Sequence, residues 1–315
     1  AIDGTYHSSG CQYCDYTSGS REQHVYEDGV CKMCGFSPVA STDWEDYSSV
    51  QAAMDALKKD RVTKGSVKLC SPAENKIVKE GIVFNYPDQE ITLNMNGYTL
   101  TNAGNPAITV EAGTLIVKGY AKISNTGKNE GISSAIKVTG GELIFEDAAE
   151  VTGGADDDQV ASAIEITGGT VTFKGAVTAT AQKIDTVQTS GVTLSPAIKV
   201  TGGEVTFAQK LTATGGLYDD TAGNKEEQQP AVYANAGTLN FQGDLALNGG
   251  LTLEGNAALV SKLKQGTFTA LEGAEVRRIS VDGMTERTYL HDLLADGYAF
   301  ADSNRELVNA GGSYQ

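Results

Sequence analysis

Residues 135–147 read AIKVTGGELIFED, and four other stretches of the chain repeat this sequence with small changes. The copies are AITVEAGTLIVKG from Ala107, AIEITGGTVTFKG from Ala163, AIKVTGGEVTFAQ from Ala197 and AVYANAGTLNFQG from Ala231. Their starts therefore lie 28, 28, 34 and 34 residues apart. Self-similarity at a regular period of this length is typical of repeat architectures, in which each unit stacks on the one before it.

Three short strands are predicted within one period. Ile136 and Val138 flank Lys137, which is the two-residue alternation of a strand with one buried face. Two glycines follow, and glycine adopts the positive φ of a tight corner without steric penalty. A second strand resumes at residues 143–145, and Val151 lies on a third. The β-branched and aromatic content of these segments favours strands over helices.

A single period cannot bury its apolar side, so the units are expected to stack. Ile136 would then lie on Ile108 and beneath Ile164, and Phe145 beneath Phe173, in continuous buried columns. Three strands and three corners per period predict an all-β fold, a right-handed parallel β-helix (a solenoid) of about eight rungs. A β-sandwich needs hairpin turns, and a propeller blade needs four strands in about 40–45 residues, so both fit the repeat less well.

The period varies in length because insertions fall at one place, between the third strand and the next Ala-Ile pair. They read SNTGKNEGISS, GGADDDQVAS, TAQKIDTVQTSGVTLSP and GGLYDDTAGNKEEQQP. Insertions at one corner of a repeat emerge along one edge, and loops of this kind often carry function. The predicted binding region is this edge, with loops at 156–159, 181–195 and 217–229, or the flat strand faces.

Acidic and aromatic side chains near this edge are the candidate ligand-binding residues. They are Asp156, Asp157, Asp158, Asp219 and Asp220, with Tyr218 and Tyr233 as the aromatic residues that would suit a glycan. Hard oxygen ligands on flexible loops suit calcium, so a calcium site is one hypothesis for the aspartates. Ordinary solvation of exposed acids is the alternative.

Acids at equivalent repeat positions bear on whether the protein cuts glycans. Glycoside hydrolysis needs two carboxyl groups about 5–9.5 Å apart. Glu142 and Glu204 share a repeat position, but Thr170 lies between them, so they are expected two rungs, or about 10 Å, apart. Lys137 and Glu165 fit cross-rung charge pairing instead. No phosphate-binding loop, nucleophile elbow or HExxH motif occurs in the sequence, and no catalytic residue is predicted.

The composition limits the partners. The chain has 315 residues, 24 Lys and Arg, 40 Asp and Glu, and a formal charge of −16. Binding to nucleic acid or to an anionic membrane surface needs clustered positive charge, so neither is expected. No run approaches the roughly 18–20 apolar residues that span a bilayer, so no membrane insertion is expected. The protein is predicted to be a monomer.

The first forty residues contain four cysteines in two pairs. Cys11 and Cys14 form one C-x-x-C pair, and Cys31 and Cys34 form the second. This spacing predicts a four-cysteine zinc site. Four thiolates fill the tetrahedral shell, so the zinc would be structural and would stabilise a segment too small to have its own core. Two disulfides, or redox-active pairs, are the alternatives.

The sequence divides into four expected units. Residues 1–42 form the zinc-ribbon-like module, 43–66 an N-terminal capping helix, 67–280 the β-helix and 281–315 a C-terminal cap with a helix and a hairpin. The capping helix would begin after Ser48 or Ser49. Its buried face would consist of Val50, Ala53, Met54 and Leu57. Cys70, in an apolar strand, is expected to be a buried thiol.

Several motifs together resemble large surface proteins of Gram-positive bacteria. They are HxxxCxxC, HVYEDGVCKMCGF, GSVKLC, ITLNMNGYTL, the repeated AIxVTGG, SKLKQGTFT and HDLLADGYAF. In those proteins, pectin-lyase-like β-helix regions alternate with short zinc-ribbon-like C-x-x-C modules. The resemblance implies an extracellular, cell-wall-associated location, and it transfers no catalytic motif to a numbered residue. No sortase motif or choline-binding repeat occurs, so the chain is expected to be one piece of a longer surface-anchored protein.

These observations favour a secreted, adhesin-like surface module that is not an enzyme. It would bind a host surface protein or a glycan, or display other domains. One alternative is a glycan-active β-helix enzyme, a polysaccharide lyase or glycoside hydrolase. A second alternative is a passive structural spacer.

Overall fold

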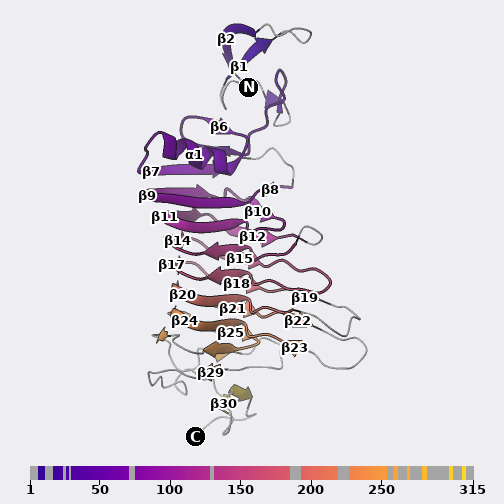
Figure 1. Cartoon of the computed structure of the whole chain (residues 1–315), viewed down its shortest axis with the longest axis vertical. Helices are drawn as coiled ribbons and strands as arrows, with labels where there is room; N and C mark the ends of the chain where they lie inside the picture. The colour runs from indigo at the N-terminus through magenta and orange to yellow at the C-terminus, as the bar shows by residue number, and fades with distance from the viewer. Residues whose placement is uncertain are drawn as a thin grey trace.

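The computed structural model describes residues 6–10, 17–23, 26–27, 30–70, 75–127, 131–184, 193–218, 227–253, 258–261, 268–269, 279–281, 298–300 and 307–309. Within these residues the protein is mostly β, with parallel sheets and one helix. Figure 1 shows an elongated molecule whose strands cross the long axis and lie one above another. The prediction of an all-β repeat fold is confirmed at this level.

One long sheet contains eight strands, and each strand pairs in parallel with its neighbours. In sheet order they are β8 (Ile77–Lys79), β10 (Thr99–Asn102), β12 (Ala121–Asn125), β15 (Ala149–Thr152), β18 (Val177–Thr180), β21 (Leu211–Thr214), β25 (Leu245–Asn248) and β28 (Phe268–Thr269). Each is the third strand of its period, as the sequence pattern predicts.

The second large sheet contains fourteen strands and carries the first and second strands of each period. They are β5 (Ala40–Ser41), β6 (Asp46–Tyr47), β7 (Lys64–Leu69), β9 (Ile82–Asn94), β11 (Ile108–Lys118), β13 (Ile136–Val138), β14 (Glu142–Phe145), β16 (Ile164–Ile166), β17 (Thr170–Phe173), β20 (Ile198–Phe207), β24 (Val232–Phe241), β26 (Leu251–Leu253), β27 (Ala258–Ser261) and β29 (Ile279–Val281). Two long strands, β11 and β20, continue around a corner, so each pairs with both the first and the second strand of the neighbouring rung. The pairings therefore close into a ring of six parallel strands, in the order β11, β13, β16, β20, β17 and β14.

Equivalent isoleucines of successive periods lie over one another. Ile108 pairs with Ile136, Ile136 with Ile164, and Ile164 with Ile198, and all four are fully buried. The same column continues to Ile82 at one end and through Val232 and Leu251 to Ile279 at the other. The predicted stacking is therefore confirmed, and we call each layer of three strands a rung.

The buried phenylalanines form a second column. Phe145, Phe173, Phe207 and Phe241 stack with successive ring centroids 4.8, 5.1 and 5.5 Å apart. Each ring is buried, and the interplanar angles of 13°, 4° and 18° leave neighbouring rings nearly parallel. This geometry follows from the strand pairing, because residues in register on parallel strands project in the same direction about 4.8 Å apart.

Glycine is required at the corner between the first and second strands. Gly141 and Gly169 have φ of 66° and 73°, a region that favours glycine. A Cβ atom on Gly169 would lie only 2.5 Å from the carbonyl oxygen of Gly141 on the rung before it. The Gly-Gly pairs of the repeat therefore allow both the turn and the close approach of successive rungs.

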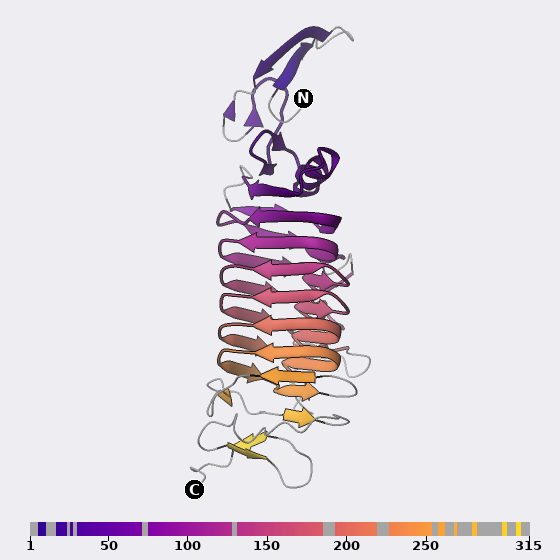
Figure 2. The ribbon, with the colours of Figure 1, turned by 90° about the vertical axis from the view of Figure 1, so that its left-hand side faces the viewer.

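Each rung presents three outward faces, one for each strand. The first face contains the outward residues of β13 and β16, the second face those of β14 and β17, and the third face those of β15 and β18. Along each strand, buried and solvent-facing residues alternate. Figure 2 shows the rungs stacked with little rotation between them, so equivalent outward residues form straight columns.

The helix α1 (Val50–Lys59) packs against the first rungs. Ser49 is its N-cap, and the Ser49 hydroxyl accepts a hydrogen bond from the Ala52 amide at 3.0 Å. The predicted apolar face is the buried one, and it consists of Val50, Ala53, Met54 and Leu57. The helix contacts β5, β6, β7 and β9 and lies beside the start of the stack in Figure 1.

The ends of the described chain carry small antiparallel sheets. At the N-terminal end, β1 (Tyr6–Gly10) pairs with β2 (Thr17–Gln23), and β3 (Tyr26–Glu27) pairs with β4 (Val30–Cys31). At the other end, β30 (Tyr298–Phe300) pairs with β31 (Leu307–Asn309), which confirms the predicted hairpin. The helix predicted just before this hairpin lies outside the described residues.

The prediction for Cys70 needs a correction. It was expected to be buried, but it follows the end of β7 and is only half buried. Partial burial raises the pKa of the Cys70 thiol, and the nearby Asp46 acts in the same direction.

Candidate functional site

The insertions at the predicted edge stack on one another as the core strands do. The β19 strand (Lys183–Ile184) pairs in parallel with β22 (Leu217–Tyr218), which pairs antiparallel with β23 (Glu227–Gln228). Further backbone bonds link the loops, including Val160 N–H to the Thr193 carbonyl at 2.8 Å. We call the described parts of these loops, residues 153–162, 181–184, 193–196, 215–218 and 227–230, the loop ridge.

The loop ridge is anchored by apolar side chains beneath it. Val160 is 1% exposed and Ile184 is 7% exposed, and both belong to the hydrophobic core. Leu194 and Tyr218 are partly buried and pack against the same core. The edge that varies most in sequence is therefore ordered, with its own three-stranded sheet packed on the core.

Asp156 has a structural role in the first described loop of the ridge. Its Oδ1 accepts hydrogen bonds from the backbone N–H groups of Asp158 at 3.0 Å and Gln159 at 2.8 Å. These bonds close a turn between Ala155 and Val160, which form an antiparallel bridge. A side chain that holds its own turn in this way is typical of aspartate in loops. Sequence reasoning did not foresee this use of the carboxylate.

The other predicted ligand-binding residues are spread out. Asp157 and Asp158 are exposed at the tip of the same turn, whereas Asp219 and Asp220 lie outside the described residues. In the part of the chain that the structure describes, no three or more His, Cys, Asp or Glu residues group as metal ligands would.

The two predicted aromatic residues lie on different strands. Tyr218 is half buried in the loop ridge, in register with Ile184. Tyr233 is half buried on the first face, in register with Lys199 and Thr252.

One of the two cysteine pairs lies within the described chain. Cys31 ends β4 and is buried, Cys34 is exposed, and the intervening residues form a tight turn. Gly35 has φ of 70°, its N–H bonds to the Cys31 carbonyl at 2.9 Å, and the Cys31 N–H bonds to the Phe36 carbonyl at 2.8 Å. Two thiols presented by one closed turn suit a zinc ion. Cys11 and Cys14 lie outside the described residues.

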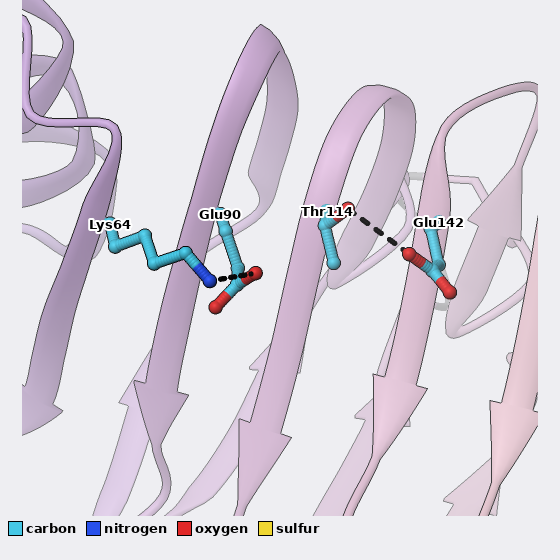
Figure 3. A network of polar contacts seen from close by, with 4 residues as sticks. All are labelled: Lys64, Glu90, Thr114 and Glu142. Carbon is cyan, nitrogen blue, oxygen red and sulfur yellow. Dashed lines mark hydrogen bonds and ion pairs between the residues drawn. The ribbon is translucent and has the colours of Figure 1, made fainter.

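The second face carries a column of polar side chains at the start of each second strand. Lys64, Glu90, Thr114 and Glu142 occupy equivalent positions on four neighbouring strands, as Figure 3 shows. Lys64 Nζ lies 2.9 Å from Glu90 Oε2, and the Thr114 hydroxyl donates to Glu142 Oε2 at 3.1 Å. The column continues in register through Thr170, Glu204 and Thr238.

Acids and threonines alternate along this column, which we call the Glu/Thr column. Thr170 separates Glu142 from Glu204, as the sequence predicts, and Thr114 separates Glu90 from Glu142. Nearest acids are thus two rungs, or about 10 Å, apart. This spacing is longer than the two carboxyl groups of a glycosidase require.

The third face carries an exposed aromatic ring held by an acid. Tyr120 is 54% exposed, and its hydroxyl donates to Glu150 Oε2 at 2.8 Å. Lys122 Nζ lies 3.1 Å from the other carboxylate oxygen of Glu150. The hydrogen bond from Tyr120 and the charge of Lys122 lower the pKa of the Glu150 carboxyl, and the same contact raises the pKa of Tyr120.

Sequence reasoning missed two surface residues, Glu90 and Tyr120. Glu90 belongs to a rung that lacks the AIxVTGG signature, but it precedes Ile-Thr-Leu as Glu142 precedes Leu-Ile-Phe. That similarity is the sequence signal that would have assigned Glu90 to the same column as Glu142. Tyr120 stands where the next two rungs have Ala148 and Ala176, so no repeated feature marks it.

Comparison with protein-family models, curated proteins and solved structures finds no significant match for this chain. Among the described residues, no helix is long and apolar enough to cross a membrane.

Proposed function

We propose that the chain is a non-catalytic binding and display module of a bacterial cell surface. In this proposal the stacked strands are a right-handed parallel β-helix of about eight rungs, or roughly 40 Å long. The domain boundaries would be those expected from the sequence, with a zinc-ribbon-like module over 1–42 and caps over 43–66 and 281–315. The partner would be a host surface protein or a glycan outside the cell.

The loop ridge is the observation that carries this proposal. The core columns repeat the same residue types from rung to rung, whereas the ridge loops differ from one another in length and sequence. Yet these loops are ordered against each other by β19, β22 and β23. Variable, well-supported loops on a rigid scaffold are a common arrangement for recognition surfaces.

The zinc site is proposed as a structural element of the N-terminal module. An isolated two-stranded hairpin is at best marginally stable, and β1–β2 and β3–β4 are both two-stranded sheets. A zinc ion held by Cys11, Cys14, Cys31 and Cys34 would supply the missing stabilisation. Elemental analysis of protein purified without chelator should give one zinc per chain. Two disulfides and no metal would reject this part of the proposal.

Binding arrays provide the functional test. The intact protein should bind at least one component of a glycan or host-protein array. A variant in which residues 181–195 and 217–229 are replaced by short Gly-Ser linkers should lose that signal while keeping the circular dichroism spectrum of the parent. Equal binding by both proteins would show that the loop ridge is not the binding surface. Absence of any binding would favour the passive spacer.

A further inference from the structure

The second face carries a regular pattern of polar side chains that has no part in the role proposed for the loop ridge. From Glu90 to Thr238 the Glu/Thr column alternates carboxylate and hydroxyl over six rungs without interruption. Five steps of about 4.8 Å make a straight row of about 24 Å. Identical chemical groups recur every two rungs, or about every 10 Å.

The neighbouring column on the same face supplies apolar surface. Ile116 and Ile144 are in register with each other and with Thr92 and Thr172, and both isoleucines are partly exposed. They lie two residues after Thr114 and Glu142 on the same strands, so they point to the same side. The face therefore presents hydrogen-bonding groups beside a small apolar strip.

The carboxylates of the column differ in how many of their oxygens remain free to accept hydrogen bonds from a ligand. Glu90 is paired with Lys64, and the Thr114 hydroxyl binds one oxygen of Glu142. Glu204, farther along, is exposed. Ionised carboxylates only accept hydrogen bonds, so a ligand of this column must donate them. The formal charge of −16 disfavours an anionic polymer.

The period of the column restricts the ligand further. An extended polypeptide repeats its side-chain direction about every 6.7 Å, which does not match a two-rung period of about 10 Å. The disaccharide repeat of an extended β-1,4-linked polysaccharide is close in length to two rungs. Such a chain presents hydroxyl groups along its edges and C–H groups on its ring faces, which suits the column and the strip beside it.

We propose that the second face binds a neutral or amino-bearing, extended β-1,4-linked polysaccharide that lies along the long axis of the protein. Sugar hydroxyl or amino groups of alternate residues donate to Glu142 and Glu204, and the rings over the Thr114 and Glu142 rungs pack near Ile116 and Ile144. The inference rests on the proposed function, since both treat the protein as a binding module. It assigns the binding to a different surface from the loop ridge.

Titration calorimetry with hexasaccharides tests this assignment. Cellohexaose or chitohexaose should bind the intact protein, and maltohexaose, the α-1,4-linked counterpart of cellohexaose, should bind at least about tenfold more weakly. The E142A/E204A variant should lose at least about tenfold in affinity. The E150A/E165A variant removes the same charge from the third and first faces and should bind like the parent.

A swap variant tests the spacing itself. E142T/T170E keeps the composition and net charge but moves one acid by a single rung, so it should bind as weakly as E142A/E204A. If that variant does not fold, as judged by circular dichroism, E204T/T238E makes the equivalent shift farther along. Parent-like affinity in a folded swap variant would overturn the inference, and so would equal binding of cellohexaose and maltohexaose.

Failure of the second-face inference can be distinguished from failure of the proposed function. The ridge-shortened variant should bind the β-1,4-linked hexasaccharide as the parent does, because the second face is unchanged. If no β-1,4-linked hexasaccharide binds while an array ligand is lost on ridge shortening, only the present inference falls.

Discussion

The phenylalanine column places a large share of the buried aromatic surface at a single repeat position. Phe173 lies between two other rings of the stack and has no exposed surface. Replacing Phe173 by Ala should lower the free energy of unfolding by about 3–5 kcal/mol, because it removes the ring and leaves a cavity. Urea denaturation followed by circular dichroism measures this change. The adjacent, outward-facing Thr172→Ala should change stability by less than about 0.5 kcal/mol.

Two glycines, one at a corner and one in a loop, distinguish the conformational cost of a side chain at positive φ from crowding between rungs. Gly169 and Gly131 both have positive φ, but only Gly169 has another rung's backbone where a Cβ atom would lie. Gly131→Ala should therefore cost only the conformational penalty of about 1–2 kcal/mol. Gly169→Ala should cost clearly more, since successive rungs would have to move apart. Equal unfolding midpoints for the two variants would show that crowding between rungs is not important.

The Tyr120–Glu150 contact gives a pH dependence. The pKa of Glu150 is lowered by the Tyr120 hydrogen bond and by Lys122. Its contribution to stability is therefore complete above the ordinary glutamate pKa of about 4.3 and is lost as the pH falls through the lower folded value. The effect should stay below about 1 kcal/mol, because the Glu150 side chain is 35% exposed.

Glu150→Gln should remove this part of the acid-induced loss of stability. Thermal melts between pH 3 and 7, compared with the parent and with Tyr120→Phe, would show it. Tyr120→Phe keeps the ring and removes the donor, so it should weaken the pH dependence without abolishing it. An unchanged pH profile in Glu150→Gln would contradict the assignment.

At the scale of elements, α1 is attached to the first rungs by specific polar contacts as well as by its apolar face. The Glu80 carboxylate accepts hydrogen bonds from the Val50 and Gln51 amides at 2.7 and 2.8 Å. The Gln51 side chain in turn donates from Nε2 to the Val83 carbonyl at 3.1 Å and accepts from the Val83 N–H through Oε1 at 2.8 Å. A carboxylate at a helix N-terminus also interacts favourably with the helix dipole. The helix is thus fixed at its N-terminal end.

Substitutions at this end should loosen the helix without unfolding the stack. Ser49→Ala removes the N-cap and should cost about 0.5–2 kcal/mol. Glu80→Ala leaves two helix amides without their acceptor and should cost about 1–3 kcal/mol. Hydrogen exchange of the α1 amides should rise in both variants. Faster exchange throughout the core strands instead would mean that the helix is needed for the whole fold.

Sequence reasoning succeeds at this scale where the chain repeats itself. The AIxVTGG copies fix which residues stack, so the pairing of Ile136 with Ile164 and of Phe145 with Phe173 could be predicted. The ridge strands β19 and β22 could not, because their residues have no common pattern and their register depends on backbone contacts between loops. Asp156 illustrates the same limit, since an isolated Asp triplet does not reveal which carboxylate closes a turn.

At the scale of the whole molecule, the fold and the proposed surfaces depend on one geometric property. If equivalent residues lie in straight columns, the loops must form a ridge at one edge and the acids must recur every two rungs. The Glu/Thr column could be only partly predicted, because Glu90 lies in an atypical rung. Its strand β9 pairs with β11 across irregularities between Val110 and Thr114, and these hide the alignment in sequence.

A crystal structure of the protein that resolves residues 64–281 is the most direct test of this property. The account predicts that Cα atoms of register partners such as Ile108 and Ile136, or Phe145 and Phe173, lie about 4.8 Å apart on adjacent parallel strands. It also predicts that Glu142 and Glu204 lie about 10 Å apart on one face. Register partners found on separate sheets, or isoleucines of the column facing solvent, would contradict it.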